Sequence, residues 1–266
     1  MLFDPLITLE KESHIYTDAN ADIYKSVSKV IDLVKEDFDR GGISLMMAKK
    51  KAKEEGISIQ AAQSNILSEW DKNLGFSQNT GNMIHDNLEM YFKTGDCDSK
   101  VLPAARSIAL MLKGYYKFFP ELIIYNQEYK VAGMADLPAQ RTRSKQSVID
   151  IFDYKSNTSK GIEFDTAKRD ITGKIVKFYN RFMLDPLSHL EATNYNFYAL
   201  QMSLYALMIQ MLTGRRIGRL ALLFIDYKTM DVNMYPVPYL KHEAELLLKH
   251  QSMVKPLPVS NTQWSD

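Results

Sequence analysis

Two aspartates and a lysine on neighbouring predicted strands are the residues of this sequence best suited to chemistry. Asp136 closes the run V-A-G-M-A-D, and Asp153 and Lys155 lie in the run V-I-D-I-F-D-Y-K that follows a polar turn. Because side chains alternate along a strand, Asp153 and Lys155 are predicted to point to the same face. Two carboxylates beside a lysine can hold a divalent metal ion next to a general base or charge stabiliser, which is the equipment for cutting a phosphodiester.

A histidine upstream offers a further metal ligand. His85 lies four residues before Glu89 in the run G-N-M-I-H-D-N-L-E-M-Y, so both side chains are predicted on one face of a helix. The alternative is a helix with one surface histidine, but the apolar residues around His85 favour a partly buried helix. A neutral imidazole is a good ligand for Mn²⁺ and an acceptable one for Mg²⁺ beside carboxylates.

A later, strongly apolar helix carries two polar groups one turn apart. Gln201 and Tyr205 share one face of the segment Y-N-F-Y-A-L-Q-M-S-L-Y-A-L-M. Most of this helix is predicted to be core. A buried amide without a partner costs about 1–3 kcal/mol, so Gln201 needs a lysine, a metal-bound water or a phosphate to contact.

A second D-x-K, at Asp226 and Lys228, competes with the first. It follows a helix rather than an acidic strand, and it is interpreted as a strand end that reaches solvent. Asp153 instead follows the apolar residues Ile149, Ile151 and Phe152, so it is predicted to emerge from a buried strand.

Composition excludes several classes of site. The net charge of this 266-residue chain is +1, so any polyanion must be met by a local basic patch. The single cysteine, Cys97, excludes internal disulfides and a cysteine-built iron–sulfur cluster. The most apolar run, residues 197–212, is too short to span a bilayer, and the N-terminus lacks the pattern of a signal peptide. The expected location is therefore the cytoplasm, with no membrane partner.

The periodicity of apolar residues predicts helices first, then strands, one long helix, a hairpin and a last helix. The predicted helices span residues 26–38, 45–55, 58–74, 81–92, 103–118, 191–213 and 239–250. The predicted strands span residues 121–129, 131–137, 148–154, 219–227 and 232–237, and the polar segment 156–170 has no clear period. This order predicts a mixed α/β (α+β) fold, a central mixed sheet flanked by helices with a helical N-terminal part.

The motifs in this order resemble the PD-(D/E)XK nuclease superfamily. They are G-x-x-x-H-x-x-x-E, then G-x-x-D, D-x-K and Q-x-x-x-Y, preceded by H-I-Y and Y-K-S-V-S-K-V-I. The pattern looks like the branch that includes the nuclease domain of RecB and the mitochondrial genome-maintenance exonuclease. The resemblance implies a restriction-endonuclease-like sheet in a single nuclease domain over residues 1–266. Within it, residues 1–80 are the helical N-terminal portion, 81–255 the nuclease core and 256–266 a tail.

The resemblance also implies roles for the site residues. His85, Asp136, Asp153 and the Tyr154 carbonyl would bind Mg²⁺ or Mn²⁺. Lys155 would position the attacking water and stabilise charge, which makes Asp136, Asp153 and Lys155 the catalytic set. Gln201 and Tyr205 would brace the site and touch the substrate backbone. Glu89 and, less securely, Glu128 would support it.

The function expected from these residues is a divalent-metal-dependent DNA nuclease. An exonuclease acting on ends or single strands is favoured over a sequence-specific endonuclease, because no recognition domain is apparent. Residues 49–53 and 141–145 are candidates for the DNA track, with Arg215, Arg216 and Arg219 less favoured. Replication, recombination or repair would suit such an enzyme, including a phage-encoded one. The alternatives are a non-catalytic nucleic-acid-binding or assembly protein on this fold, and an unrelated α/β enzyme with a coincidental D-x-K.

Overall fold

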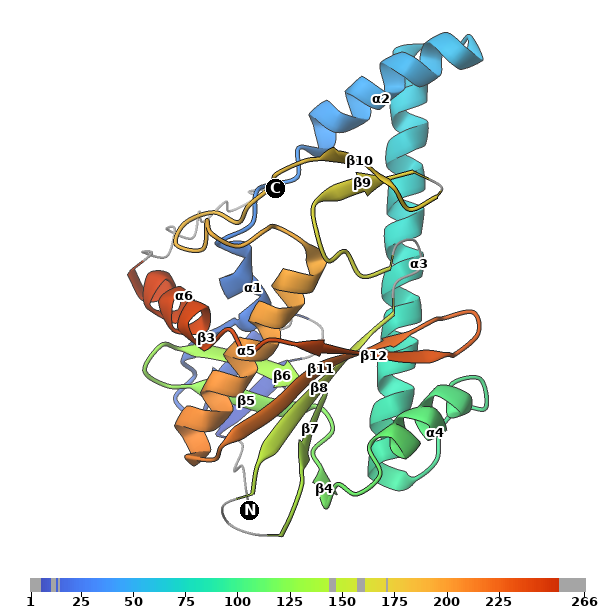
Figure 1. Cartoon of the computed structure of the whole chain (residues 1–266). Helices are drawn as coiled ribbons and strands as arrows, with labels where there is room; N and C mark the ends of the chain where they lie inside the picture. The colour runs from blue at the N-terminus through green and yellow to red at the C-terminus, as the bar shows by residue number, and fades with distance from the viewer. Residues whose placement is uncertain are drawn as a thin grey trace, which may run out of the picture.

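The computed structural model describes residues 6–10, 13, 15–143, 147–156, 161–170 and 172–253. In this part of the chain, ten strands form two five-stranded sheets and two more form a separate hairpin (Figure 1). The first sheet has the order β1 (Ile7–Glu10), β2 (Ile15–Asp18), β3 (Ile23–Ser26), β6 (Val131–Ala135), β5 (Leu122–Asn126). The second has the order β12 (Val232–Val237), β11 (Ile217–Ile225), β8 (Ile149–Lys155), β7 (Leu137–Gln140), β4 (Lys117–Phe118).

Both sheets are mixed, which confirms the predicted fold class. The pairs β3–β6 and β8–β11 are parallel, and the other pairs of the two sheets are antiparallel. A parallel pair needs a long crossover, and here the crossover from β8 to β11 contains the hairpin and a long helix.

The chain passes from one sheet to the other at Asp136. β6 ends at Ala135 in the first sheet and β7 begins at Leu137 in the second. The carbonyl oxygen of Asp136 accepts a 2.9 Å hydrogen bond from the backbone amide of Glu121, directly before β5. Asp136 and Glu121 therefore lie at the junction of the two sheets.

The described residues form six helices, and some of them lie on each face of the second sheet. They are α1 (Val27–Asp32), α2 (Arg40–Glu55), α3 (Ile59–Thr94), α4 (Leu102–Met111), α5 (Asn194–Thr213) and α6 (Lys241–Met253). Ile149 and Ile151 of β8 pack in a core with α5, whereas Phe152 and Tyr154 pack in a second core with α3 and α4. Figure 1 shows α3 and α5 on opposite sides of these strands.

The predicted helices 58–74 and 81–92 are one continuous helix, α3, of 36 residues. Its length is about 54 Å at about 1.5 Å per residue. The Ser58 hydroxyl accepts a hydrogen bond from the amide of Ala61 and begins the helix, and Gly95, with φ 89°, ends it. Gly75 and Gly81 lie in its interior, where a Cβ would meet nothing within 4 Å at Gly75 and only Ser156 Oγ, at 3.7 Å, at Gly81.

Several elements differ from the sequence prediction. The N-terminal portion begins with strands β1 to β3 before its helices, and α1 ends at Asp32, short of the predicted residue 38. The predicted helix 103–118 ends at Met111, and the last two predicted residues, Lys117 and Phe118, form β4 instead. The polar segment 156–170 contains β9 (Ala167–Arg169), which pairs with β10 (Ile175–Phe178). These strands have only two to four residues, too few to show a period.

Two further predictions concern the C-terminal tail and the absence of a membrane-spanning helix. The predicted tail, residues 256–266, lies outside the described residues. Within the described ranges, none of the helices combines the length and the apolar character needed to cross a bilayer.

Candidate functional site

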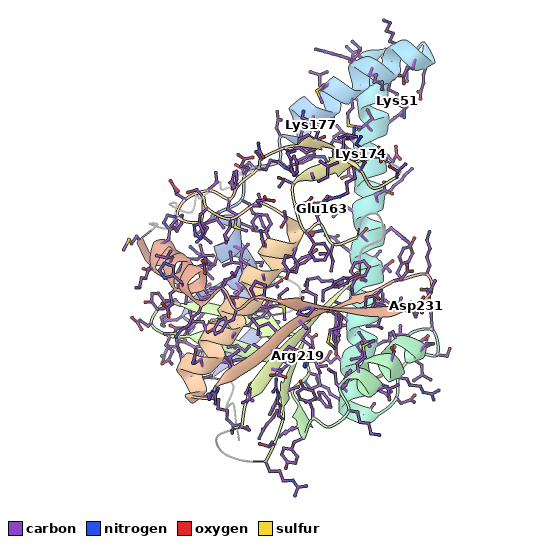
Figure 2. All side chains as sticks on the ribbon, viewed as in Figure 1. Lys51, Glu163, Lys174, Lys177, Arg219 and Asp231 are labelled. Carbon is purple, nitrogen blue, oxygen red and sulfur yellow. The ribbon has the colours of Figure 1, made fainter. Side chains whose placement is uncertain are left out.

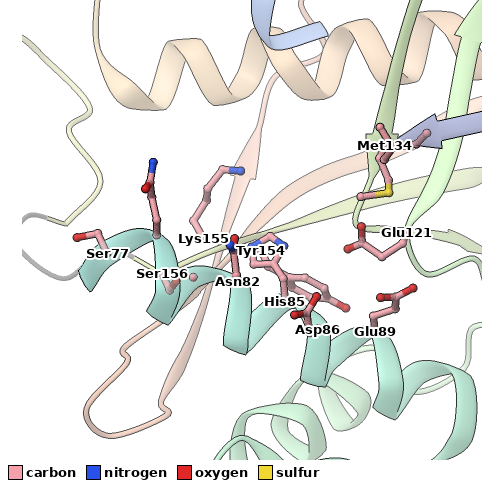
Figure 3. A pocket seen from close by; sticks show the side chains of 13 residues that line it. Ser77, Asn82, His85, Asp86, Glu89, Glu121, Met134, Tyr154, Lys155 and Ser156 are labelled. Atoms are coloured by element: carbon pink, nitrogen blue, oxygen red, sulfur yellow. The ribbon is translucent and has the colours of Figure 1, made fainter. Parts of the chain in front are cut away.

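Three side chains at the sheet junction bring possible metal-ligand atoms together. His85 of α3, Glu121 before β5 and Asp136 between β6 and β7 each place one ligand atom within 4.8 Å of the others. His85 Nδ1 is 3.6 Å from Asp136 Oδ2. Figure 3 shows His85 and Glu121 facing the same cavity, with Asp86 and Glu89 beside them. One imidazole and two carboxylates form a donor set suited to Mg²⁺ or Mn²⁺.

Glu121 was not predicted from the sequence. It precedes β5 by one residue, and its neighbour in space, Asp136, lies 15 positions later; only the antiparallel register of β5 and β6 brings them together. Its backbone has φ 50°, a left-handed conformation that costs a non-glycine residue about 1–2 kcal/mol. Strain of this kind is often kept at functional sites, but it is not visible in a sequence.

Glu128, predicted as a support, is not part of this cluster. The pairing of Leu122 with Ala135 and of Asn126 with Val131 puts the closed end of the β5–β6 hairpin at residues 127–130. Glu128 is exposed in that turn, whereas Glu121 and Asp136 occupy the open end of the same hairpin. Of these two glutamates, Glu121 is therefore the one that lies next to Asp136.

Asp153 and Lys155 lie beside the cluster, on the α5 side of β8. The register pairs Leu137 with Phe152, so one residue further along Asp136 lies opposite Asp153. Lys155 Nζ is 2.5 Å from Asp153 Oδ2, and the Asp153 side chain is 2% exposed. Asp153 does not belong to the group of three ligand atoms, and its carboxylate is held by the lysine instead. A cation bound at Asp153 would have to share it with Lys155.

The charges of Asp153 and Lys155 affect each other's protonation. Burial raises the pKa of Asp153 to about 6, and the nearby Asp136 adds to this, although Lys155 opposes it. Burial lowers the pKa of Lys155, but Asp153 and Asp136 outweigh that effect and the pKa is raised overall. Lys155 is therefore a cation at neutral pH, which favours charge stabilisation over a role as a base.

Tyr154 faces the opposite side of β8. Its ring lies 5.5 Å from the His85 ring at an interplanar angle of 87°, and its backbone amide donates a 2.7 Å hydrogen bond to Asp136 Oδ2. Its hydroxyl is buried with no hydrogen-bond partner among the described residues, and burial raises the tyrosine pKa well above its usual value. Tyr154 thus orients His85 and Asp136 through its ring and backbone.

Gln201 and Tyr205 contact each other on α5. Gln201 Nε2 donates a 3.1 Å hydrogen bond to the Tyr205 hydroxyl, so its partner in the structure is a tyrosine rather than the lysine, metal-bound water or phosphate expected from the sequence. Burial raises the pKa of Tyr205 well above its usual value, and the next contribution comes from Asp153. Tyr205 also lies against β6, where a Cβ at Gly133 would come within 2.7 Å of its ring. Tyr205 is therefore within electrostatic range of Asp153.

Tyr198, one turn before Gln201, is a contact that was not predicted. The centroid of its ring is 4.9 Å from Lys155 Nζ, an attractive arrangement of a cation with an aromatic face. The residue was indistinguishable in the sequence from the other aromatic residues of this apolar helix.

A cavity of about 490 Å³ opens over the site. Its lining includes one face of α3, the side chains of Glu121 and Met134, and Lys155. Glu89, one helical turn after His85, lines the cavity and forms an ion pair with Lys93. The cavity therefore joins the three-ligand cluster to the amine of Lys155 (Figure 3).

Arg141 and the second D-x-K do not line the cavity over the site. Arg141 binds the buried carboxylate of Asp150 through two 2.9 Å hydrogen bonds, which gives it a structural role. Residues 144–146 of the same segment lie outside the described ranges. Asp226 accepts hydrogen bonds from the amides of Lys228 and Thr229, so the second D-x-K is a turn between β11 and β12, as interpreted from the sequence.

Comparison with known proteins gives no family assignment. No protein-family model matches the chain, and no curated protein matches it. A crystal structure from Eubacterium rectale, described as a "putative exonuclease", is similar at 12% identity and a TM-score of 0.35. The similarity covers 64% of each chain, slightly less than two thirds of the relative's length. A structure described as SSO0001 is similar at 14% identity and a TM-score of 0.29, over 86% of this chain and 73% of the other. Similarities this low carry no functional argument, so function rests on the site.

Proposed function

We propose that this protein is a divalent-metal-dependent nuclease that hydrolyses phosphodiester bonds in DNA. The observation that carries the proposal is the junction of the two sheets, where His85, Glu121 and Asp136 group their ligand atoms next to the Asp153–Lys155 pair. If the Asp153–Lys155 ion pair were only structural, no further ligand atoms would be needed beside it. Three are present, and the two on His85 and Glu121 line a cavity that is open to solvent.

The residues present fit Mg²⁺ or Mn²⁺. The three grouped donors are two carboxylates and an imidazole, and Asp153 adds a third carboxylate nearby. Burial is the main cause of the raised pKa of Asp153, so the buried carboxylate holds its charge at a cost that Lys155 offsets in part. A divalent cation held by His85, Glu121 and Asp136 would supply polarisation of a phosphate and activation of water.

The protein's own groups divide the remaining work. Lys155 keeps its positive charge and stabilises the negative charge that develops on the phosphate. Tyr154 fixes the orientation of Asp136 through its backbone amide. Gln201 and Tyr205, joined by their hydrogen bond, hold the α5 side of the site in place. The cavity of about 490 Å³ would give the substrate backbone access to His85, Glu121 and Lys155, which line it.

We further propose that the enzyme is an exonuclease acting on DNA ends or single strands. The test uses purified protein with single-stranded and double-stranded DNA labelled at one end, in Mg²⁺, Mn²⁺ or EDTA. We expect cleavage in either metal and none in EDTA, with mononucleotides or short fragments released from ends. Circular DNA without ends should resist cleavage. Intact DNA in both metals at high protein concentration would refute the nuclease, and rapid cutting of circular DNA would refute the exonuclease mode.

A further inference from the structure

The segment between β8 and α5 projects a two-stranded hairpin whose side chains are unusually exposed. The β9–β10 arm comprises residues 161–170 and 172–182, and β9 and β10 pair with each other rather than with either sheet. All four residues of β10 are exposed, and so are the following Tyr179 and Phe182. A hairpin with both faces in water is marginally stable alone, so the exposure of the arm indicates that a binding partner covers it.

The exposed side chains of the arm include aromatic and basic residues beside the aliphatic Ile175 and Val176. Phe178 is 57% exposed, Tyr179 47% and Phe182 44%. Lys177 and Arg181 both lie over the ring of Tyr179, with the charged groups 4.9 Å and 5.9 Å from its centroid. Figure 2 labels Lys174 and Lys177 on this hairpin. Aromatic rings interleaved with cations are how proteins bind single-stranded nucleic acid, by stacking on bases and attracting phosphates.

The pairing of the hairpin adds an independent indication of an anionic partner. The register places Lys168 directly opposite Lys177. Like charges directly across a strand pair are destabilising, and among the described residues no carboxylate forms an ion pair with either lysine. The carboxylates of the arm are otherwise engaged: Asp165 pairs with Arg169, and Asp170 caps the turn through Thr172. An anion bound across the two lysines would remove the repulsion.

The base of the arm is fixed next to the proposed active site. The amide of Glu163 donates a 2.7 Å hydrogen bond to Asn194 Oδ1, and the Phe164 ring lies 4.9 Å from that of Tyr195. Asn194 and Tyr195 are the first two residues of α5, which one turn later presents Tyr198 to Lys155. A groove of about 420 Å³ at the base is lined by Tyr179, Arg181 and Lys168, together with Glu163 and Asp165.

We infer that the β9–β10 arm binds single-stranded nucleic acid and guides it toward the cavity over Lys155. This inference deepens the proposed function and rests on it for the destination of the strand. Exposed rings select single strands, because the bases of a duplex are stacked on each other and offer no free face.

The test is binding of fluorescein-labelled oligo(dT) and of a blunt duplex of equal length, measured by fluorescence anisotropy in EDTA. The first variant is Phe178→Ala with Tyr179→Ala, and its control is Tyr116→Ala, an exposed aromatic residue elsewhere that also contacts an arginine. We expect the arm variant to bind oligo(dT) at least about fivefold more weakly, since each stacked base contributes that much or more. Duplex binding should change less than about twofold by the same reasoning.

The second variant is Lys168→Ala with Lys177→Ala, and its control is Lys241→Ala with Lys249→Ala on α6. The dependence of affinity on salt should fall by about 0.7 in logarithmic slope for each phosphate contact removed from a single strand. The melting temperature of the arm variant should be unchanged or higher, because the cross-strand repulsion is gone. A folded arm variant with weakened binding therefore supports the inference without any ambiguity from unfolding.

The outcomes separate this inference from the nuclease itself. Arm variants that bind like their controls, or that lose duplex and single-strand binding equally, would overturn it. So would a wild-type protein that binds no oligo(dT), or an arm variant that changes only self-association in size-exclusion chromatography. Normal binding by the wild type without cleavage in Mg²⁺ or Mn²⁺ would refute the nuclease and leave the arm's role intact.

Discussion

The backbone amide of Tyr154 donates a 2.7 Å hydrogen bond to Oδ2 of Asp136, the same oxygen that lies 3.6 Å from His85 Nδ1. Tyr154, the middle residue of the D-x-K run, thus holds the carboxylate of Asp136, which lies 18 positions earlier in the chain. Asp153 and Lys155 flank Tyr154 on β8. The end of this strand therefore positions the Asp153 carboxylate and the Lys155 amine, and through Tyr154 also the Asp136 carboxylate. This arrangement makes the separate contributions of the side chains testable.

Replacing Asp153 by asparagine should abolish phosphodiester cleavage and leave the fold intact. The change keeps the size of the side chain but removes a charge that would attract a cation and that balances Lys155. Losses of several kcal/mol in barrier, or more than about a thousandfold in rate, are expected. Initial rates with end-labelled DNA and a circular dichroism melt measure both effects. Asp226→Asn, in the turn copy of the motif, is the control and should retain wild-type rates.

Lys155→Ala should lower the cleavage rate for a different reason. The amine is a cation whose charge acts on the phosphate, so its removal affects the transition state rather than metal affinity. Raising the Mn²⁺ concentration should therefore not restore activity. Recovery of wild-type rates in excess Mn²⁺ would show that Lys155 acts through the metal site.

Glu121→Gln should weaken metal binding, and Glu128→Gln should not. Glu121 contributes one of the three grouped ligand atoms, whereas Glu128 lies at the other end of the same hairpin. Isothermal titration of Mn²⁺ into the two variants compares them directly, and a loss of about tenfold or more in affinity is expected for Glu121→Gln alone. Equal Mn²⁺ affinity in both variants would remove Glu121 from the site.

Gln201→Ala should reduce cleavage more than it reduces stability. The amide is half-buried and has one described partner, the Tyr205 hydroxyl, so the change costs about 1 kcal/mol of folding free energy. Its effect on activity follows from the position of Tyr205 beside Asp153. A variant that melts much earlier than the wild type but keeps full specific activity would identify Gln201 as a core residue.

The stability of the protein should fall as the pH rises from about 10 to about 12. Burial, with a hydrogen bond to Asp150, raises the pKa of Tyr115 to about 12, and burial does the same for Tyr16 and Tyr239. In this range the unfolded chain loses tyrosine protons that the folded protein keeps. Because the folded state binds more protons, the free energy of unfolding decreases as the pH rises. Arg141 and Arg219 oppose the shift at Tyr115. Urea melts across this range should show a smaller decline for Tyr115→Phe.

Local patterns predicted the parts of the site that lie on one element. The alternation of β8 put Asp153 and Lys155 on one face, and helical spacing put Gln201 and Tyr205 together. Glu121 could not be found this way, because it reaches Asp136 through a strand register and a change of sheet. Tyr198 depends on the packing of α5 over β8. The fold class followed from the order of elements, but the short strands β1 to β3 carry too few residues to reveal a period.

The three grouped ligand atoms belong to α3, to the start of β5 and to the point where the chain changes sheets. A cation shared by these groups would tie a helix and both sheets together, and the unfolded chain would offer no comparable site. Folding and cation concentration are then thermodynamically linked. At a free concentration one hundred times the dissociation constant, the native state gains about 2.7 kcal/mol. The ion would thus serve the architecture of the sheet junction as well as the reaction.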